Sequence, residues 1–126
     1  MTKPVLFSIV ESSSHPNFAA LYQRLGLEEV RLDSQRKAIS ELKKRRPDYI
    51  VADFIYAFAT YYQATNISNL DVLLSSLVKY APEARVIVLV GKEDRERVDQ
   101  LNAILPLHAI FTYPVSEEQM ATALRE

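Results

Sequence analysis

The sequence predicts an α/β protein, a three-layer sandwich whose five parallel strands lie in the order 2-1-3-4-5 with helices on both faces. Short apolar runs alternate with segments of helical spacing, and this alternation repeats five times along the 126 residues. The chain is 48% hydrophobic and 25% charged, as ordinary soluble globular domains are. Its length fits a single domain over residues 1–126. Short right-handed crossovers make this strand order the most economical one.

Five apolar runs predict the strands, over residues 4–10, 28–32, 48–54, 85–90 and 109–113. The first is nearly continuous in apolar residues, as a strand buried on both faces is. The second carries Glu28, Glu29 and Arg31, so we expect it at an edge of the sheet. The fourth is the most β-branched run in the chain, and Gly91 ends it.

Helical spacing follows each strand, over about 16–25, 34–45, 69–81, 94–105 and from 116 onward. Gly26 is placed to end the first helix in a left-handed conformation. The pairs Ser68 with Asp71 and Ser116 with Gln119 have the capping-box spacing that begins a helix. The order of elements is therefore strand and helix in strict alternation.

Composition excludes several kinds of chemistry. The chain has no cysteine, which rules out disulfides, thiolate nucleophiles, iron-sulfur clusters and cysteine zinc sites. Its two glycines are too few for a phosphate-binding P-loop or a dinucleotide fingerprint. His15 and His108 belong to no metal-ligand spacing, and the serines at 12–14 have no accompanying base, with Ser14 expected to cap a helix.

The charge balance gives no general attraction to nucleic acid or to anionic lipid. The formal net charge is −1, and the basic run at 43–46 lies where cations complement the end of a helix. The sequence contains no apolar run long enough to span a membrane and no recognisable export signal. We expect a cytoplasmic protein that binds neither membranes nor nucleic acid directly.

The expected site lies at the carboxyl ends of the strands, beside the point where the strand order reverses. The residues that reach this edge are Glu11, Ser12, Asp53, Val90, Gly91 and those at 112–114. Three of the surrounding segments resemble the receiver domains of two-component response regulators: RRPDYIVADF, VIVLVG and FTYPVS. The resemblance spans the chain and implies the flavodoxin-like fold. It places Asp53 at the phosphate-accepting aspartate and Pro114 at the proline after strand five.

The resemblance also implies a machinery that this chain lacks. Receivers use an acidic pair to hold Mg²⁺, a hydroxyl after strand four and a lysine before the strand-five proline. Here the pair reads Glu11 and Ser12, the hydroxyl position is Val90 and the lysine position is Tyr113. The sequence therefore favours a degenerate receiver, or pseudo-receiver, that is phosphorylated slowly or not at all. The alternative is a genuine receiver phosphorylated on Asp53 with Mg²⁺, and Glu11 with Asp53 is a weak candidate for the metal site.

An uncharged, aromatic-rich insertion occupies about 54–69. Its aromatic residues are Phe54, Tyr56, Phe58, Tyr61 and Tyr62. Three interpretations remain open: a lid that fills the acidic pocket, a partner-binding surface, and a small-molecule pocket beneath the lid.

We expect the protein to act through contact with a signalling or output protein, and as a homodimer, rather than as an enzyme. The resemblance implies that the fourth helix, the fifth strand and the fifth helix form the contact face. On that face lie Arg95, Val98, Leu101 and Tyr113.

Overall fold

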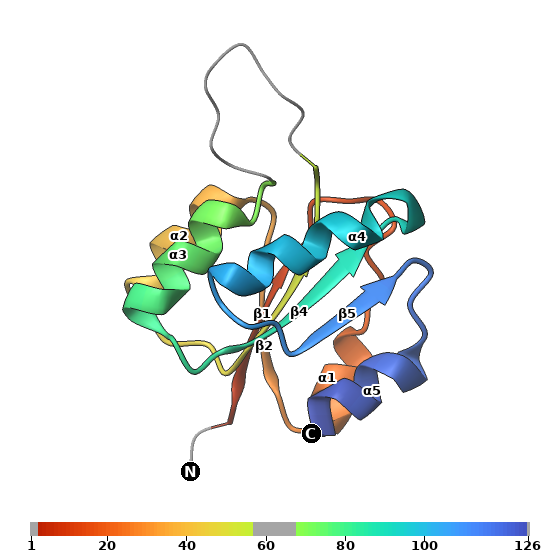
Figure 1. The fold of residues 1–126 in the computed structure, drawn as a ribbon. Coiled ribbons are helices and arrows are strands. Elements are labelled where there is room, and N and C mark those ends of the chain that lie inside the picture. Colours follow the sequence, from red (N-terminus) through yellow and green to blue (C-terminus); the bar gives the residue numbers. More distant parts are fainter. Residues whose placement is uncertain (1–2, 57–67, 126) are drawn as a thin grey trace.

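The computed structural model describes residues 3–56 and 68–125. A single five-stranded parallel sheet runs through the described part of the chain, in the order β2-β1-β3-β4-β5 (Figure 1). The strands are β1 (Val5–Ile9), β2 (Glu28–Leu32), β3 (Tyr49–Asp53), β4 (Arg85–Val90) and β5 (Ala109–Thr112). The predicted strand order is therefore confirmed. β2, whose residues are all exposed or half-buried, lies at an edge as its charges indicate.

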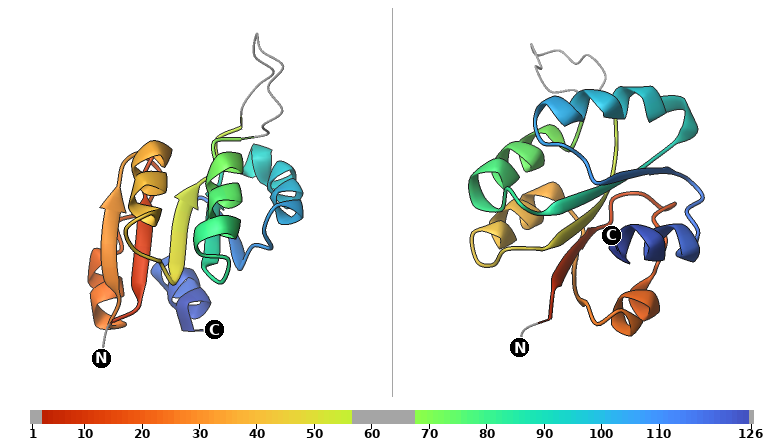
Figure 2. Two further views of the ribbon diagram at one scale, coloured as in Figure 1. Left: turned by 90° about the vertical axis from the view of Figure 1, so that its left-hand side faces the viewer. Right: turned by 60° about the horizontal axis from the view of Figure 1, so that its bottom comes forward.

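Helices cover both faces of the sheet (Figure 2). They are α1 (Ala19–Arg24), α2 (Gln35–Leu42), α3 (Asp71–Tyr80), α4 (Arg95–Val98) and α5 (Glu117–Arg125), with 3-10 turns at Lys92–Asp94 and Asp99–Ala103 on either side of α4. Residues of α2, α3 and α4 pack into the core on one face. Residues of α1 and α5 pack on the other.

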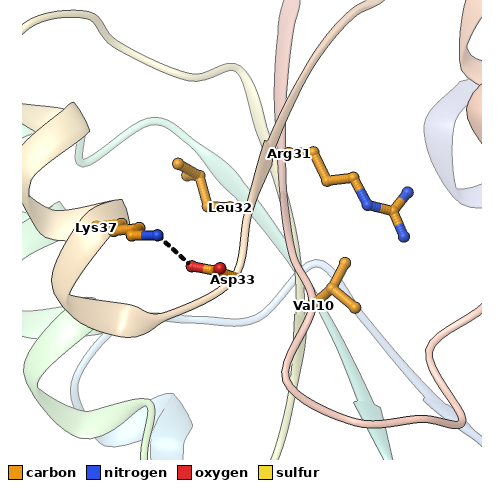
Figure 3. A pocket seen from close by; sticks show the side chains of 5 residues that line it. All are labelled: Val10, Arg31, Leu32, Asp33 and Lys37. Carbon is orange, nitrogen blue, oxygen red and sulfur yellow. Dashed lines mark ion pairs between the residues drawn. The ribbon is translucent and has the colours of Figure 1, made fainter.

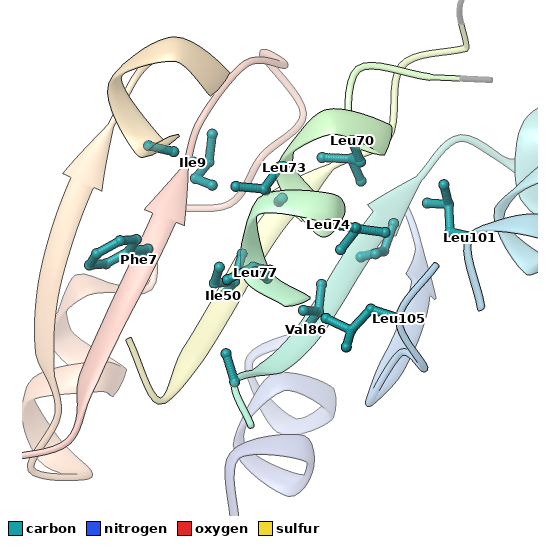
Figure 4. Close-up of a cluster of buried hydrophobic side chains, with 14 of the residues drawn as sticks. Phe7, Ile9, Ile50, Leu70, Leu73, Leu74, Leu77, Val86, Leu101 and Leu105 are labelled. Carbon is teal, nitrogen blue, oxygen red and sulfur yellow. The ribbon is translucent and has the colours of Figure 1, made fainter. Parts of the chain in front are cut away.

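The larger core lies between the sheet and the α2, α3 and α4 layer (Figure 4). Leu70, Leu73, Leu74 and Leu77 form the predicted stripe, and all four are fully buried against Phe7, Ile50 and Val86 of the sheet. Strands buried on both faces have apolar residues facing both ways, which explains the continuous runs in their sequence. This packing fixes the strand ends that carry the candidate site.

Local signals placed most helix ends correctly. Gly26 has a φ of +77°, and Ser116 exchanges hydrogen bonds with Gln119 as a capping box does. Ser34 caps α2 by accepting a hydrogen bond from the Lys37 amide. Ser68 does not cap α3 as predicted, because the capping position is Leu70; the Ser68 amide and hydroxyl instead both donate to Asp71 Oδ1.

Two other helices also differ from the prediction. The first begins at Ala19 and not near Pro16, because the preceding chain forms an irregular loop in which the Ser14 amide donates to the Ser12 hydroxyl. Ser14 therefore does not cap a helix. The fourth is broken into short α and 3-10 segments although it covers the expected stretch. Within the described residues, no helix is long and apolar enough to cross a membrane.

The core predicts a large difference between two substitutions on α3. Leu74→Ala removes a fully buried side chain and should lower the free energy of unfolding by about 2–5 kcal/mol. Val72→Ala, two residues earlier, removes a side chain that is 51% exposed and should change it by less than about 0.5 kcal/mol. Urea unfolding followed by circular dichroism measures both. Equal effects of the two substitutions would contradict this packing.

Candidate functional site

Asp53 is the last residue of β3, and its side chain lies at the carboxyl edge of the sheet with no exposed surface. β1 and β4 flank β3, so the loops that leave these strands surround the carboxylate. The position is the one expected from the strand order. The complete burial of an acidic group requires hydrogen-bond donors around it.

Among the described residues, four donors surround the Asp53 carboxylate. The amides of Glu11 and Ser12 donate to Oδ2 at 2.9 and 3.1 Å. His15 Nδ1 lies 2.8 Å from the same oxygen, and since an ionised carboxylate can only accept, this nitrogen carries the proton. The Tyr113 hydroxyl donates to Oδ1. Both carboxylate oxygens are therefore engaged by the protein itself.

These contacts keep Asp53 ionised. Burial raises the pKa of Asp53, but the hydrogen bonds from His15, Tyr113 and the Glu11 amide together outweigh it and hold the pKa below its usual value. Burial, with the hydrogen bond to Asp53 and its charge, raises the pKa of the Tyr113 hydroxyl. Tyr113 therefore stays a neutral donor beside a carboxylate.

Tyr113 follows β5, and its amide donates to the Val90 carbonyl at 3.0 Å. Its side chain reaches past the end of β4 to Asp53 at the end of β3. Val90 is fully buried, and Pro114 follows a cis peptide bond at an exposed position. Neither residue brings a hydroxyl or a cation to the site.

The other acidic side chain of the site, Glu11, is held by amide groups. Its Oε1 accepts hydrogen bonds from Gln35 Nε2 at 2.7 Å and from Asn69 Nδ2 at 2.9 Å. Asn69 also donates to the Asp53 carbonyl at 2.9 Å, so it links Glu11 to the end of β3. Gln35 is the first residue of α2, and Asn69 lies two residues before α3.

The residues present do not fit Mg²⁺. This ion prefers several carboxylate oxygens and bound water, whereas the oxygens of Asp53 accept from four protein donors and Ser12 replaces the second acid. Within residues 3–56 and 68–125, no cluster of three histidine or acidic side chains is arranged to hold a metal ion.

Sequence reasoning missed three residues of this site: His15, Gln35 and Asn69. The predicted first helix starts at about residue 16, directly after His15, whereas in the structure His15 belongs to an irregular loop and contacts Asp53. One signal was available for His15 and Gln35, since they lie a few residues after β1 and β2 at the edge where the site was expected.

Part of the predicted contact set lies in the core. Phe54, Val98 and Leu101 are 5%, 0% and 0% exposed. They pack against the sheet and cannot form an exposed contact surface, which corrects that part of the prediction. Arg95 is half-buried and forms an ion pair with Asp99 at 3.2 Å. Phe58, Tyr61 and Tyr62 lie outside the described residues.

The described ends of the aromatic insertion are joined to each other. Tyr56 and Ser68 form an antiparallel bridge. The Ile55 amide donates to Asn69 Oδ1 at 2.8 Å, and the Asn69 amide donates to the Ile55 carbonyl at 3.1 Å. The insertion therefore leaves and re-enters the fold at one point, directly beside the site.

A cavity of about 510 Å³ opens next to Tyr113. Its lining residues are Ser12, Ser14, Phe54, Ile55, Tyr56, Gly91, Glu93, Asp94 and Tyr113. A second hollow, of about 380 Å³, lies by the edge strand β2 (Figure 3). There the Asp33–Lys37 ion pair, at 2.9 Å, and Arg31 lie on opposite sides of β2, so the charges do not converge on one ligand.

The lowered pKa of Asp53 predicts a pH-dependent contribution to stability. A carboxyl with a lower pKa in the folded state stabilises the fold above its unfolded pKa, and this contribution is lost as the pH falls through the folded value. Asp53→Asn leaves the buried donors without their charged acceptor and should cost about 1–3 kcal/mol near neutral pH. The difference between wild type and variant should shrink below about pH 4. Urea unfolding at several pH values measures it, and a difference that stays constant would contradict the assignment.

Comparisons of the sequence with protein-family models and with curated proteins found no match. Solved structures, most of them response-regulator receiver domains, do match the fold. A response regulator from Thermotoga maritima has a TM-score of 0.71 at 14% identity, covering 98% of this chain and 96% of that one. The chemotaxis protein CheY4 of Vibrio cholerae has a TM-score of 0.73 at 14% identity, covering 98% of both chains. The chain thus has the flavodoxin-like fold of the response-regulator receiver domains.

Proposed function

We propose that the protein is a pseudo-receiver, a regulatory module that acts by binding other proteins and is not phosphorylated efficiently. The observation that supports this most strongly is the state of Asp53, which is fully buried with both carboxylate oxygens hydrogen-bonded to the protein. An attacking oxygen must be reachable by the phosphodonor. Here Tyr113 and the loop after β1 cover the two oxygens of Asp53 and separate them from a phosphodonor.

Charge supports the same proposal. Transfer to Asp53 would bring a phosphoryl group with about two negative charges into the site. The described residues that contact Asp53 include one imidazole and no lysine or arginine, and the position of the lysine in receivers holds Tyr113. With no metal cluster among the described residues, little would offset this charge.

Incubation with a small phosphodonor and Mg²⁺, followed by intact-mass analysis, tests the proposal. We expect the wild-type protein to keep its unmodified mass, because Asp53 is covered and the charge of the product is uncompensated. A phosphoryl adduct that is absent from Asp53→Asn would overturn the proposal in favour of a genuine receiver. An adduct that persists in Asp53→Asn would place the modification elsewhere and leave the prediction for Asp53 intact.

We propose further that the surface of β5 and α5 mediates homodimerisation. β5 is an edge strand whose four residues are only half-buried. Between β5 and α5 lies a groove of about 420 Å³, lined by Ala109, Phe111, Glu118, Gln119, Thr122 and Ala123. Val98 and Leu101 of the predicted contact face are buried and cannot contact a partner. The groove between β5 and α5 therefore supplies the exposed apolar surface of that face.

Sedimentation velocity tests the surface. We expect a concentration-dependent dimer that Thr122→Arg weakens at least about tenfold, because a charged side chain then fills the groove. Val72→Arg on α3, at a position also exposed, is the matched control and should leave the dimer unchanged. A wild-type protein that remains monomeric, or equal effects of both substitutions, would contradict the assignment.

A further inference from the structure

The cavity beside Tyr113 carries an inference beyond the proposed function. Its volume of about 510 Å³ lies within the range of small-ligand sites. Four segments line it: the loop after β1, the residues after β3, the turn after β4 and Tyr113 after β5. Because four separate parts of the chain line the cavity, it does not depend on a single exposed helix or loop.

The lining is acidic and aromatic. Glu93 and Asp94 are its charged side chains, and no lysine, arginine or histidine is among the described residues that line it. Asp94 is partly compensated, since its Oδ1 lies 3.3 Å from Arg97 Nε. No ion pair between described residues involves Glu93. The negative charge of Glu93 and Asp94 would repel an anionic ligand and attract a cationic one.

Gly91 lies directly beside the Glu93 carboxylate in the lining of the cavity. A Cβ atom at this position would lie 2.6 Å from Glu93 Oε1. The φ of Gly91 is −71°, which any residue can adopt, so the backbone conformation does not explain the glycine. A side chain at position 91 would require the flexible Glu93 carboxylate to move from this place beside the cavity.

The rim already binds a cationic group of the same chain. The Arg97 guanidinium lies 3.9 Å from the ring centroid of Tyr56 while it pairs with Asp94. An aromatic ring with a carboxylate beside it is a suitable environment for guanidinium groups. Glu93 and Tyr113 offer the same combination at the cavity.

We propose that this cavity binds an organic cation, a guanidinium, amidinium or ammonium group on an apolar body. The body packs against Tyr113 and Ile55, whose side chain is 44% exposed, and the charged end pairs with Glu93. Since Tyr113 also donates to Asp53, the ligand contacts the residue that closes the receiver site. The inference rests on the cavity and not on whether Asp53 can be phosphorylated.

Benzamidine, benzamide and benzoate test the proposal, because they share one ring and carry positive, neutral and negative charge. The chain has two glycines, so ¹⁵N-glycine labelling gives two amide resonances. Gly91 lines the cavity, whereas Gly26 follows α1 and is an internal control. Benzamidine should shift Gly91 in a saturable way without moving Gly26, benzamide should bind more weakly, and benzoate should not bind.

Glu93→Gln should weaken benzamidine binding about two- to fivefold, the range for an exposed ion pair. Glu96→Gln, at an exposed position outside the lining, is the matched control and should leave it unchanged. N-acetylarginine methylamide distinguishes the two sources of the cation: tighter binding than benzamidine indicates an arginine side chain of a partner, and weaker binding a free aromatic cation. An unmoved Gly91 resonance, equal binding of benzoate, or no effect of Glu93→Gln would overturn the proposal.

Discussion

The buried carboxylate of Asp53 is the constraint on which the carboxyl edge of the sheet depends. An acid with no exposed surface destabilises a fold unless donors replace the water that it loses. The donors come from the loop after β1 and from Tyr113 after β5. One side chain on β3 therefore holds together segments that leave two other strands. The course of the irregular loop before α1 follows from this, since it must bring two amides and His15 to the same oxygen.

Under the proposed function, the same contacts prevent the Asp53 carboxylate from acting as a phosphoacceptor. A phosphoacceptor and a metal ligand need lone pairs that other molecules can reach, whereas those of Asp53 are used internally. Glu11 is likewise directed toward Gln35 and Asn69. We propose that recognition takes place at the rim of this site, where the insertion joins the fold at Tyr56 and Ser68 and where the acidic cavity opens. Tyr113 belongs to both regions, so it connects the closed centre with the exposed rim.

The fold could be predicted from sequence because each strand and helix has its own periodic signal. Asp53 and Tyr113 were placed correctly since strand order alone brings strand ends together. His15, Gln35 and Asn69 were missed because their roles depend on partners far along the chain, which no local pattern encodes. Val98 and Leu101 show the opposite error. They were assigned to a surface through a family resemblance, although apolar residues at helical spacing are more simply explained as core.

The central claim is that hydrogen bonds from Tyr113 and the loop after β1 hold Asp53 as a buried carboxylate. A ¹³C NMR titration of the Asp53 side-chain carbon measures this directly, in the wild-type protein and in Tyr113→Phe. The account predicts a pKa for wild-type Asp53 below the usual value, and a higher pKa once the tyrosine hydroxyl is removed. A wild-type pKa at or above the usual value of about 3.9, unchanged in Tyr113→Phe, would contradict it.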